Sequence, residues 1–322
     1  MQLGLLTDSL GNRPLHEALD AAAELGLDTV EIAMGNWSTA PHANLDELVS
    51  SAPARAALAD AVSSRGLTLS ALNANGNQLH PVSGPAHDRV VRDTIRVAGE
   101  LGVPTVVLMS GLPGSDATAK YPNWVTTSWP PETATILEYQ WQEVATPYWE
   151  DLAAFARANG VRLAVEMHGS QLVYNVASFK RLKSIVGDDV VGANLDPSHL
   201  MWMGADILTA IRSLGSSIYH VHAKDVRIER HNADVNGIND PLPPADAADR
   251  SWNFVTLGLG HPGGAGFWAD FVYALRSVGY EGPLNIEHED VVVNSYEGVQ
   301  KSAELLRSVV LRDPADWKPA AV

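Results

Sequence analysis

The 322-residue sequence contains no cysteine. This absence excludes thiol catalysis, disulfides, and zinc or iron–sulfur sites built on cysteine, and it constrains the cellular compartment only weakly. The sequence also lacks any apolar run near the ~20 residues that a membrane-spanning helix needs. Its first residues, MQLGLLTD, lack the basic segment with which a signal peptide begins. We therefore expect a soluble, cytoplasmic protein that does not bind membranes.

Basic residues are scarce as well. The chain has 22 Lys and Arg against 38 Asp and Glu, which gives a net charge of −16. Nucleic acids and anionic membranes bind through clustered basic residues, so neither is an expected partner. The acidic surplus is sufficiently explained by a soluble, self-repelling surface and says nothing about a reaction.

Strand-like and helical segments alternate along the chain, which is long enough for one large barrel or two ordinary domains. The expected strands are 2–8, 28–34, 67–75, 104–110, 161–169, 190–196, 217–224 and 283–289. The expected helices are 14–26, 44–66 with an interruption near Pro53, 85–102, 136–160, 176–187, 205–215, 267–279 and 296–311. Eight strand–helix pairs favour a single parallel (β/α)8 barrel, a TIM barrel, over residues 1–311, followed by a tail at 312–322.

Two long loops, 111–135 and 225–265, follow the fourth and seventh strands. In such a barrel the active site lies at the carboxyl ends of the strands, so both loops rise from the active-site face. The first contains Tyr121, Trp124 and Trp129. These aromatic residues fit a packed lid, subunit contact or aromatic wall, and they equally fit a small satellite hydrophobic cluster.

The fifth strand, VRLAVEMHG, carries the first candidate site residues. Its alternation places Glu166 and His168 together on the face opposite Leu163 and Val165. An ionised carboxylate buried there without a partner would cost several kcal/mol. A structural Glu paired with an Arg is the alternative interpretation.

The next three strands end in the same way and make that alternative less favourable. Asp196 ends the sixth strand, VVGANLD, and His222 lies in the seventh, SIYHVHAKD. The eighth, PLNIEHED, turns Glu287 inward and His288 outward. Glu166, Asp196, His222 and Glu287 should therefore meet at one rim. Three carboxylates at one spot repel unless a cation holds them, and three oxygens with one imidazole suit Mn²⁺, Mg²⁺ or Co²⁺ better than structural zinc.

Other polar residues are expected around this metal site. We expect His220 and Glu289 to support the ligands rather than bind the ion. His288 and Asp290 are expected on the surface or in loops. The candidate substrate-binding residues are His199 of the DPSH motif, Lys224 after the metal His, Asn73 at the end of the third strand, and Trp129.

These motifs, E-x-H, D-P-S-H, H-V-H-A-K-D and E-H-E-D on consecutive strands, carry a family resemblance. The chain resembles the xylose-isomerase-like barrels of the sugar phosphate isomerase/epimerase superfamily over nearly its whole length. The resemblance implies one divalent metal ion, for which we expect Mn²⁺ with Mg²⁺ or Co²⁺ as alternatives, bound by Glu166, Asp196, His222 and Glu287. Ketose 3-epimerases of that family use the first and last Glu as acid and base, so Glu166 and Glu287 are also candidate catalytic residues.

Three features depart from the epimerases: His168, the pair Lys224–Asp225, and the segment YPNWVTTSWP. They are more similar to the catalytic α subunit of bacterial C-glycoside deglycosidases, which cleave the sugar–aglycone C–C bond of 3-oxo-C-glycosides and work with a small β-sheet subunit. This resemblance implies a 3-oxo-C-glycoside substrate and a small β subunit in a hetero-oligomer. The alternatives are a keto-sugar epimerase or isomerase and a non-enzymatic sugar- or metal-binding barrel.

The chemistry common to the enzymatic alternatives is removal of a proton next to a sugar ketone. A bound metal acts as Lewis acid and stabilises the enediolate that forms. His168 is the expected base, because a neutral imidazole accepts protons at neutral pH, whereas a Glu bound to a cation is a poorer base. In the alternative role, His168 merely orients Glu166.

Overall fold

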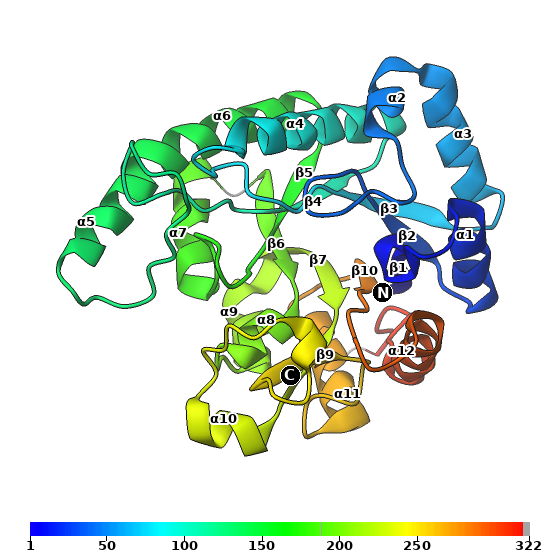
Figure 1. Cartoon of the computed structure of the whole chain (residues 1–322). Helices are drawn as coiled ribbons and strands as arrows, with labels where there is room; N and C mark the ends of the chain where they lie inside the picture. Colours follow the sequence, from blue (N-terminus) through cyan, green and yellow to red (C-terminus); the bar gives the residue numbers. More distant parts are fainter. Residues whose placement is uncertain (188, 318–322) are drawn as a thin grey trace, which may run out of the picture.

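The computed structural model describes residues 1–187 and 189–317. Eight parallel strands close into a barrel in the order β1-β10-β7-β6-β5-β4-β3-β2 (Figure 1). They are β1 Gln2–Leu6, β2 Thr29–Ala33, β3 Thr68–Asn73, β4 Thr105–Met109, β5 Arg162–Glu166, β6 Val191–Leu195, β7 Ile218–Ala223 and β10 Pro283–Ile286. The predicted TIM barrel is confirmed.

Helices lie between consecutive barrel strands and cover the outside of the barrel (Figure 1). They are α1 Leu15–Glu24, α2 Leu45–Ser50, α3 Ala52–Ser63, α4 Gly84–Leu101, α6 Thr146–Ala158, α7 Val176–Val186, α9 Ile207–Leu214, α11 Gly264–Ser277 and α12 Ser295–Val309. The predicted interruption near Pro53 is confirmed. Ser51 ends α2, its side chain accepts a hydrogen bond from Ala54 N, and Pro53 occupies the first turn of α3, where a missing N–H is tolerated.

Successive side chains of each strand point alternately out of the barrel, toward the helices, and into the barrel interior. Outward-facing residues such as Leu163 and Val165 pack under the helices in one large apolar core, whose largest fully buried side chains include Trp149 and Trp268. Inside the barrel, small residues such as Ala164 fill the lower layer. The upper layers hold buried polar side chains instead: Glu31, Asn194, His220, His222 and Asn285.

The predicted helix 136–160 is divided into three parts. They are α5 Glu132–Tyr139, a π-helical turn η2 Gln140–Ala145, and α6. Pro147 at the start of α6 has no N–H to donate to the preceding turn, which accounts for the change of helix type. Gln140 Nε2 donates to the carbonyl oxygens of Pro113, Gly114 and Asn123 and so ties the first long loop to this turn. Figure 1 shows α5 extending away from the barrel.

The second long loop folds as a hairpin over the barrel mouth. Strands β8 Asp225–Ile228 and β9 Trp252–Val255 pair antiparallel, with α10 Arg230–Asn236 and η4 Pro244–Asp246 between them. The fold also contains a short helix α8 Pro197–Trp202 after β6, and short 3₁₀ segments η1 Thr7–Leu10 and η3 Gly215–Ser217. None of these elements was predicted from the sequence.

Across the described part of the chain, every helix is too short or too polar to cross a membrane. Of the predicted tail at 312–322, residues 318–322 lie outside the described residues.

Candidate active site

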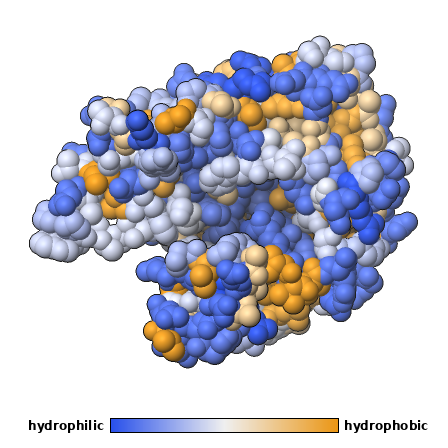
Figure 2. Space-filling model, viewed as in Figure 1, coloured by the Kyte–Doolittle hydropathy of each residue, from blue (hydrophilic) through white to orange (hydrophobic). Residues whose placement is uncertain are grey.

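A cavity of about 380 Å³ opens at the carboxyl ends of the barrel strands. Its walls include Asp8, Asn75, His168, Lys224 and Glu287, which follow five different strands. Figure 2 shows a hollow on this face of the molecule, surrounded mainly by hydrophilic residues. This is the face on which TIM barrels carry their active sites.

The four residues predicted as metal ligands lie close together, and two of them, Glu166 and Glu287, line this cavity. Glu166, Asp196, His222 and Glu287 each offer one ligand atom, and these atoms all lie within 4.8 Å of one another. Asp196 also caps α8, because its Oδ1 accepts from Ser198 N at 2.8 Å and from Ser198 Oγ at 2.7 Å. This cap turns the other oxygen, Oδ2, toward the group.

The donor set fits a divalent ion. Asp196 Oδ2 and Glu287 Oε2 are buried and accept no hydrogen bond from any described residue, although Lys224 Nζ lies 3.0 Å from each. His222 Nε2 lies 3.0 Å from both oxygens of Glu31, while its Nδ1 lies 3.1 Å from Glu287 Oε2. A carboxylate that holds the far nitrogen of a His is the usual support for a metal-binding imidazole. These residues could therefore hold a metal ion through Nδ1 and the carboxylates, and the donor set alone does not select one metal.

Glu31, in the interior of β2, is a site residue to which sequence analysis gave no role. Its Oε2 accepts from His220 at 2.7 Å and from Asn285 at 2.9 Å, and its Oε1 accepts from Asn73 at 2.8 Å. Burial raises the pKa of Glu31, but His222 and His220 outweigh burial and hold it well below its usual range. The signal in the sequence was a charged residue in the interior of the strand TVEIA. The structure buries every residue of this strand.

Lys224 adds a buried positive charge to the group. Its Nζ lies 3.0 Å from Glu289 Oε2 as well as from the two ligand carboxylates, and 4.6 Å from the centre of the Phe254 ring. Burial lowers the pKa of Lys224, but Asp196 and Glu287 raise it well above its usual value. Lys224 and His222 lower the pKa of Glu287 to about 2 against the effect of burial. The Glu287 carboxylate is thus ionised at neutral pH.

His168 and His199 form one wall of the cavity, with ring centres 3.9 Å apart. His199 Nε2 lies 3.2 Å from Glu166 Oε1 and 3.3 Å from Asp196 Oδ2. His168 Nδ1 contacts the carbonyl oxygen of Gly169, which favours a proton on Nδ1 and leaves the lone pair on Nε2. Burial and then His199 lower the pKa of His168 to about 3, so its ring is neutral.

The remaining predicted residues have mixed placements. Asn73 lines the cavity and donates to Glu31, whereas its neighbour Asn75 donates to Glu166 Oε2 at 2.8 Å. Glu289 contacts Lys224 rather than a candidate ligand, and its side chain is 50% exposed. His288, expected to face outward, packs its ring against Gly298 of α12 and also lines the cavity edge.

Trp129 is the predicted site residue that the structure does not bring to the site. Trp129 is 75% exposed, and it lines neither the 380 Å³ cavity at the candidate metal site nor the cavity beside it. The Trp of that loop which reaches the site is Trp124. It lies in this second cavity, of about 540 Å³, together with Trp202, Trp252 and Phe254.

The second cavity adjoins the first, because His168 and His199 line both. Trp202 and Trp252 stack with ring centres 4.8 Å apart. One wall of histidines thus separates a polar, carboxylate-rich cavity from an aromatic one.

Comparison with known proteins supports the superfamily expected from the motifs. The family model described as xylose isomerase-like TIM barrel matches residues 19–309. A protein of Bacillus subtilis (strain 168), named Uncharacterized protein YfiH, is 46% identical over 314 residues, which cover 96% of this chain and 99% of that protein.

Two solved structures share the fold at low sequence identity. The probable 3-DHS dehydratase AsbF of Bacillus anthracis has a TM-score of 0.69 and 15% identity, with 95% of this chain and 99% of that chain covered. D-psicose 3-epimerase of Clostridium cellulolyticum H10 has a TM-score of 0.61 and 16% identity, with 96% and 99% covered. These matches do not address the narrower resemblance to C-glycoside deglycosidases, which stays a prediction.

Proposed function

Because the chain belongs to the xylose isomerase-like TIM-barrel family, we propose that it is a divalent-metal-dependent enzyme of the sugar isomerase/epimerase type. In this proposal it removes a proton from the carbon next to a sugar ketone and returns a proton to give an epimer or isomer. The observation that carries the proposal is the convergence of Glu166, Asp196, His222 and Glu287 at one side of a cavity that His168 also lines.

The proton moves between groups of this chain. A divalent ion held by the four residues would polarise the substrate carbonyl and so acidify the adjacent C–H bond. His168 Nε2 accepts the proton, the electron pair of the C–H bond forms a C=C bond, and the π pair of the carbonyl moves to its oxygen. Return of a proton to the opposite face of the same carbon gives an epimer, and return to the former carbonyl carbon gives an isomer. Glu287 follows β10, which β6 and β7 separate from the β5 strand before His168, so its carboxylate lies on another side of the site. For the epimer, water held beside Glu287 supplies the returning proton, and His168 gives up its proton to the hydroxide that remains. For the isomer, His168 itself returns the proton.

Other residues hold the substrate and limit the access of water. Lys224 is 2% exposed, and its ammonium group can stabilise negative charge that develops on a substrate oxygen. His199 Nδ1 is buried with no hydrogen-bond partner in the described part of the chain, so it can bond a substrate hydroxyl. The names of the two structural neighbours, an epimerase and a dehydratase, support the proposal, because both reactions can begin with removal of a proton next to a carbonyl.

Deuterium exchange tests the shared first step. Mn²⁺-loaded protein is incubated in D2O with a panel of free ketopentoses and ketohexoses, and the sugars are analysed by NMR and mass spectrometry. We expect deuterium on a carbon next to the ketone of at least one sugar, together with a new epimer or aldose. The variant His16→Asn, exposed on α1, is the control and should exchange normally. No exchange with any sugar would contradict the proposal.

Elimination is a second candidate, favoured by the aromatic cavity that shares His168 and His199 with the metal-site cavity. After proton removal from a 3-oxo-C-glycoside, the electron pair would form a C=C bond and the aromatic aglycone would leave with the bonding pair of the sugar–aglycone bond and gain a proton. The side chains of Trp202, Trp252 and Phe254 offer flat apolar faces for such a group. This candidate carries with it the proposed small β subunit.

Product analysis separates the two candidates. The Mn²⁺-loaded chain, alone and co-expressed with a small protein encoded beside it, is incubated with 3-oxo-C-glucosides and with free ketoses. Release of free aglycone would support elimination, and its dependence on the second chain would support the hetero-oligomer. Epimer formation by the chain alone, without aglycone release, would support the first candidate.

A further inference from the structure

The loop between β2 and α2 closes one side of the metal-site cavity and brings Trp37, Ser38 and Thr39 into its wall. Asn36 and Ala40 flank these residues with φ angles of 65° and 48°, which non-glycine residues rarely adopt. Asn36 Nδ2 donates to the carbonyl oxygen of Ala74 at 2.9 Å, which holds the loop against the end of β3. Strained backbone that neighbouring residues hold in place is typical of functional segments.

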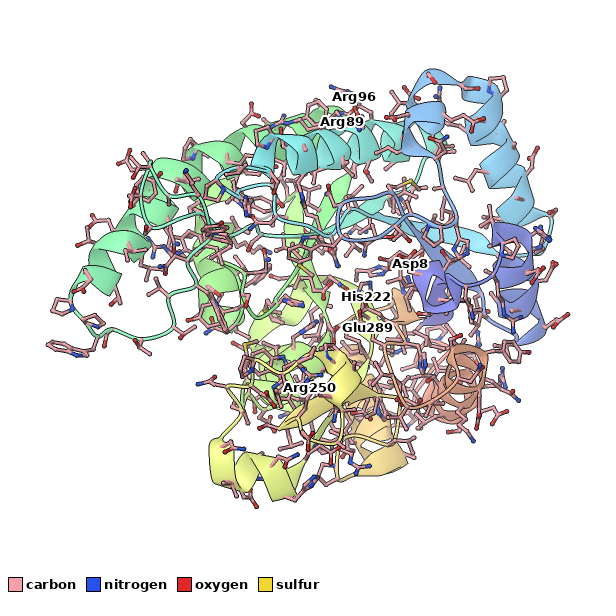
Figure 3. All side chains as sticks on the ribbon, viewed as in Figure 1. Asp8, Arg89, Arg96, His222, Arg250 and Glu289 are labelled. Atoms are coloured by element: carbon pink, nitrogen blue, oxygen red, sulfur yellow. The ribbon has the colours of Figure 1, made fainter. Side chains whose placement is uncertain are left out.

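Asp8, in η1 after β1, faces the same end of the cavity. Ser38 Oγ donates to Asp8 Oδ2 and in turn accepts from Ala40 N at 2.8 Å. The other oxygen, Asp8 Oδ1, is buried and has no hydrogen-bond partner within residues 1–187 and 189–317. Asp8 follows β1, which pairs with β10, the strand that precedes Glu289 (both residues are labelled in Figure 3). Asp8 is not part of the four-residue metal group, and the proposed proton transfer does not use it.

Trp37 lines the same cavity as this carboxylate and is 52% exposed. An exposed large aromatic ring can pack against the C–H face of a sugar. A carboxylate oxygen without a partner accepts strong hydrogen bonds from hydroxyl groups. The two together, with Ser38 holding the carboxylate in place, offer both kinds of contact that a polyhydroxylated chain or ring makes.

We propose that Asp8, Ser38 and Trp37 form a subsite that binds the hydroxyl groups of the substrate at the end away from the reacting ketone. The Asp8 carboxylate accepts from those hydroxyls, Ser38 holds this carboxylate through its hydroxyl group, and Trp37 packs against the carbon chain. The subsite selects ketoses that are long enough to carry such hydroxyls over shorter ones. This inference rests on the proposed function, since it assumes that the ketone end lies at the metal group.

The variant Asp8→Asn tests the subsite with two probes, D-fructose and the four-carbon ketose erythrulose, which lacks the distal hydroxyls. Exchange kinetics are measured with Mn²⁺-loaded protein, and binding is measured separately by saturation-transfer NMR. We expect the KM for D-fructose to rise about tenfold or more, as for loss of a hydrogen bond to a charged group. The kcat and the values for erythrulose should change little.

Two further variants complete the test. Trp37→Ala should also weaken the binding of D-fructose more than the binding of erythrulose, whereas Trp37→Phe should keep much of the binding of D-fructose. Asp46 carries an exposed carboxylate on the adjacent helix α2, and Asp46→Asn is the matched control. It should change the KM and the binding of neither sugar. The melting temperature of each variant is recorded, so that misfolding is not taken for weak binding.

The outcomes distinguish the subsite from the proposed function. No exchange by the parent protein with any ketose overturns the proposed function, and the binding comparison then still decides on the subsite. Equal loss for D-fructose and erythrulose in Asp8→Asn overturns the subsite, because Asp8 would then only hold the loop or act at the reacting end. Unchanged D-fructose binding in Asp8→Asn, or no binding of D-fructose to the parent, overturns it as well.

Discussion

Glu31 shows at the scale of single residues how one candidate metal ligand, His222, is held in place. The two oxygens of Glu31 lie within hydrogen-bond distance of four side chains from three other strands: His220, His222, Asn285 and Asn73. The contact with His222 Nε2 leaves Nδ1 for the cavity. Glu31 therefore positions the imidazole that sequence analysis identified as a ligand.

Replacing Glu31 by Gln should weaken both the fold and the metal site. The change removes the charge that two buried imidazoles face, and breaking a buried ionic contact in this way costs about 3–5 kcal/mol. We also expect divalent-ion affinity to fall about 10–100-fold, as for loss of other groups that support metal ligands. Chemical denaturation and calorimetric titration with Mn²⁺ measure the two effects. Glu17→Gln, exposed on α1, is the control, and unchanged ion affinity in Glu31→Gln would contradict this role.

His168→Asn addresses the base. The amide can still hydrogen-bond but cannot accept a proton at neutral pH, so turnover should fall at least ~100-fold, the low end for loss of a general base. Metal content, measured by atomic emission, should be retained, because His168 is not one of the four grouped residues. Loss of metal together with activity would favour an orienting role toward Glu166. Near-normal turnover would return the role of base to Glu166 or Glu287.

The β8–β9 hairpin determines, at the scale of elements, how the site is covered. It carries Trp252 and Phe254 over the histidine wall. Asp225, the first residue of β8, holds the segment after β9 in place. Its carboxylate accepts from Gly258 N at 2.9 Å, from His261 N at 3.0 Å and from Trp268 Nε1 at 3.3 Å. One side chain thus joins the hairpin to α11.

Asp225→Asn should loosen this cover without opening the barrel. An amide has one acceptor oxygen where the carboxylate has two. Some of the N–H groups that donate to Asp225 therefore lose their partner, which lowers the free energy of unfolding by about 1–3 kcal/mol. Hydrogen exchange followed by mass spectrometry should show faster exchange at residues 256–263 and unchanged exchange in the barrel strands. Asp234→Asn on α10, which forms an exposed pair with Arg230, is the matched control. Equal loosening of all strands would show that Asp225 supports the whole fold instead.

Negative charge dominates the barrel mouth of a molecule whose net charge is already −16. Glu166, Asp196 and Glu287 face one spot, and Lys224 Nζ lies 3.0 Å from the carboxylates of Asp196 and Glu287. Like charges at such short range destabilise the folded state unless a cation offsets them. A bound divalent ion should therefore contribute to the stability of the whole molecule.

Removing the ion should lower both activity and melting temperature. A ligand that binds only the folded protein stabilises it by about 2.7 kcal/mol at 100 times its Kd. We expect the melting temperature of the parent protein to rise with Mn²⁺ concentration after chelation and dialysis. Asp196→Ala should show no such rise, and alanine at any of the four positions should abolish activity. Full activity in a metal-free preparation would contradict metal dependence.

The sequence by itself determined the barrel and the inner face of its strands. The alternation of strand and helix predicted a parallel barrel, and the period of two within the strands placed Glu166 and His222 inside it and Leu163 outside. These are properties of contiguous residues, because side-chain direction in a strand depends only on position along that strand. The convergence of the four candidate ligands followed from the same rule, since all parallel strands end at one rim.

Tertiary structure alone decided the contacts between distant segments. The partners of Glu31 lie 42 to 254 residues away, and Asp8 meets Ser38 only because the β2–α2 loop folds back over β1. Sequence analysis named Trp129 where the folded loop brings Trp124 to the site. The physical reason is common to all three. The register with which the barrel closes, and the path of the chain beyond each strand end, depend on packing between segments, which no local periodicity encodes.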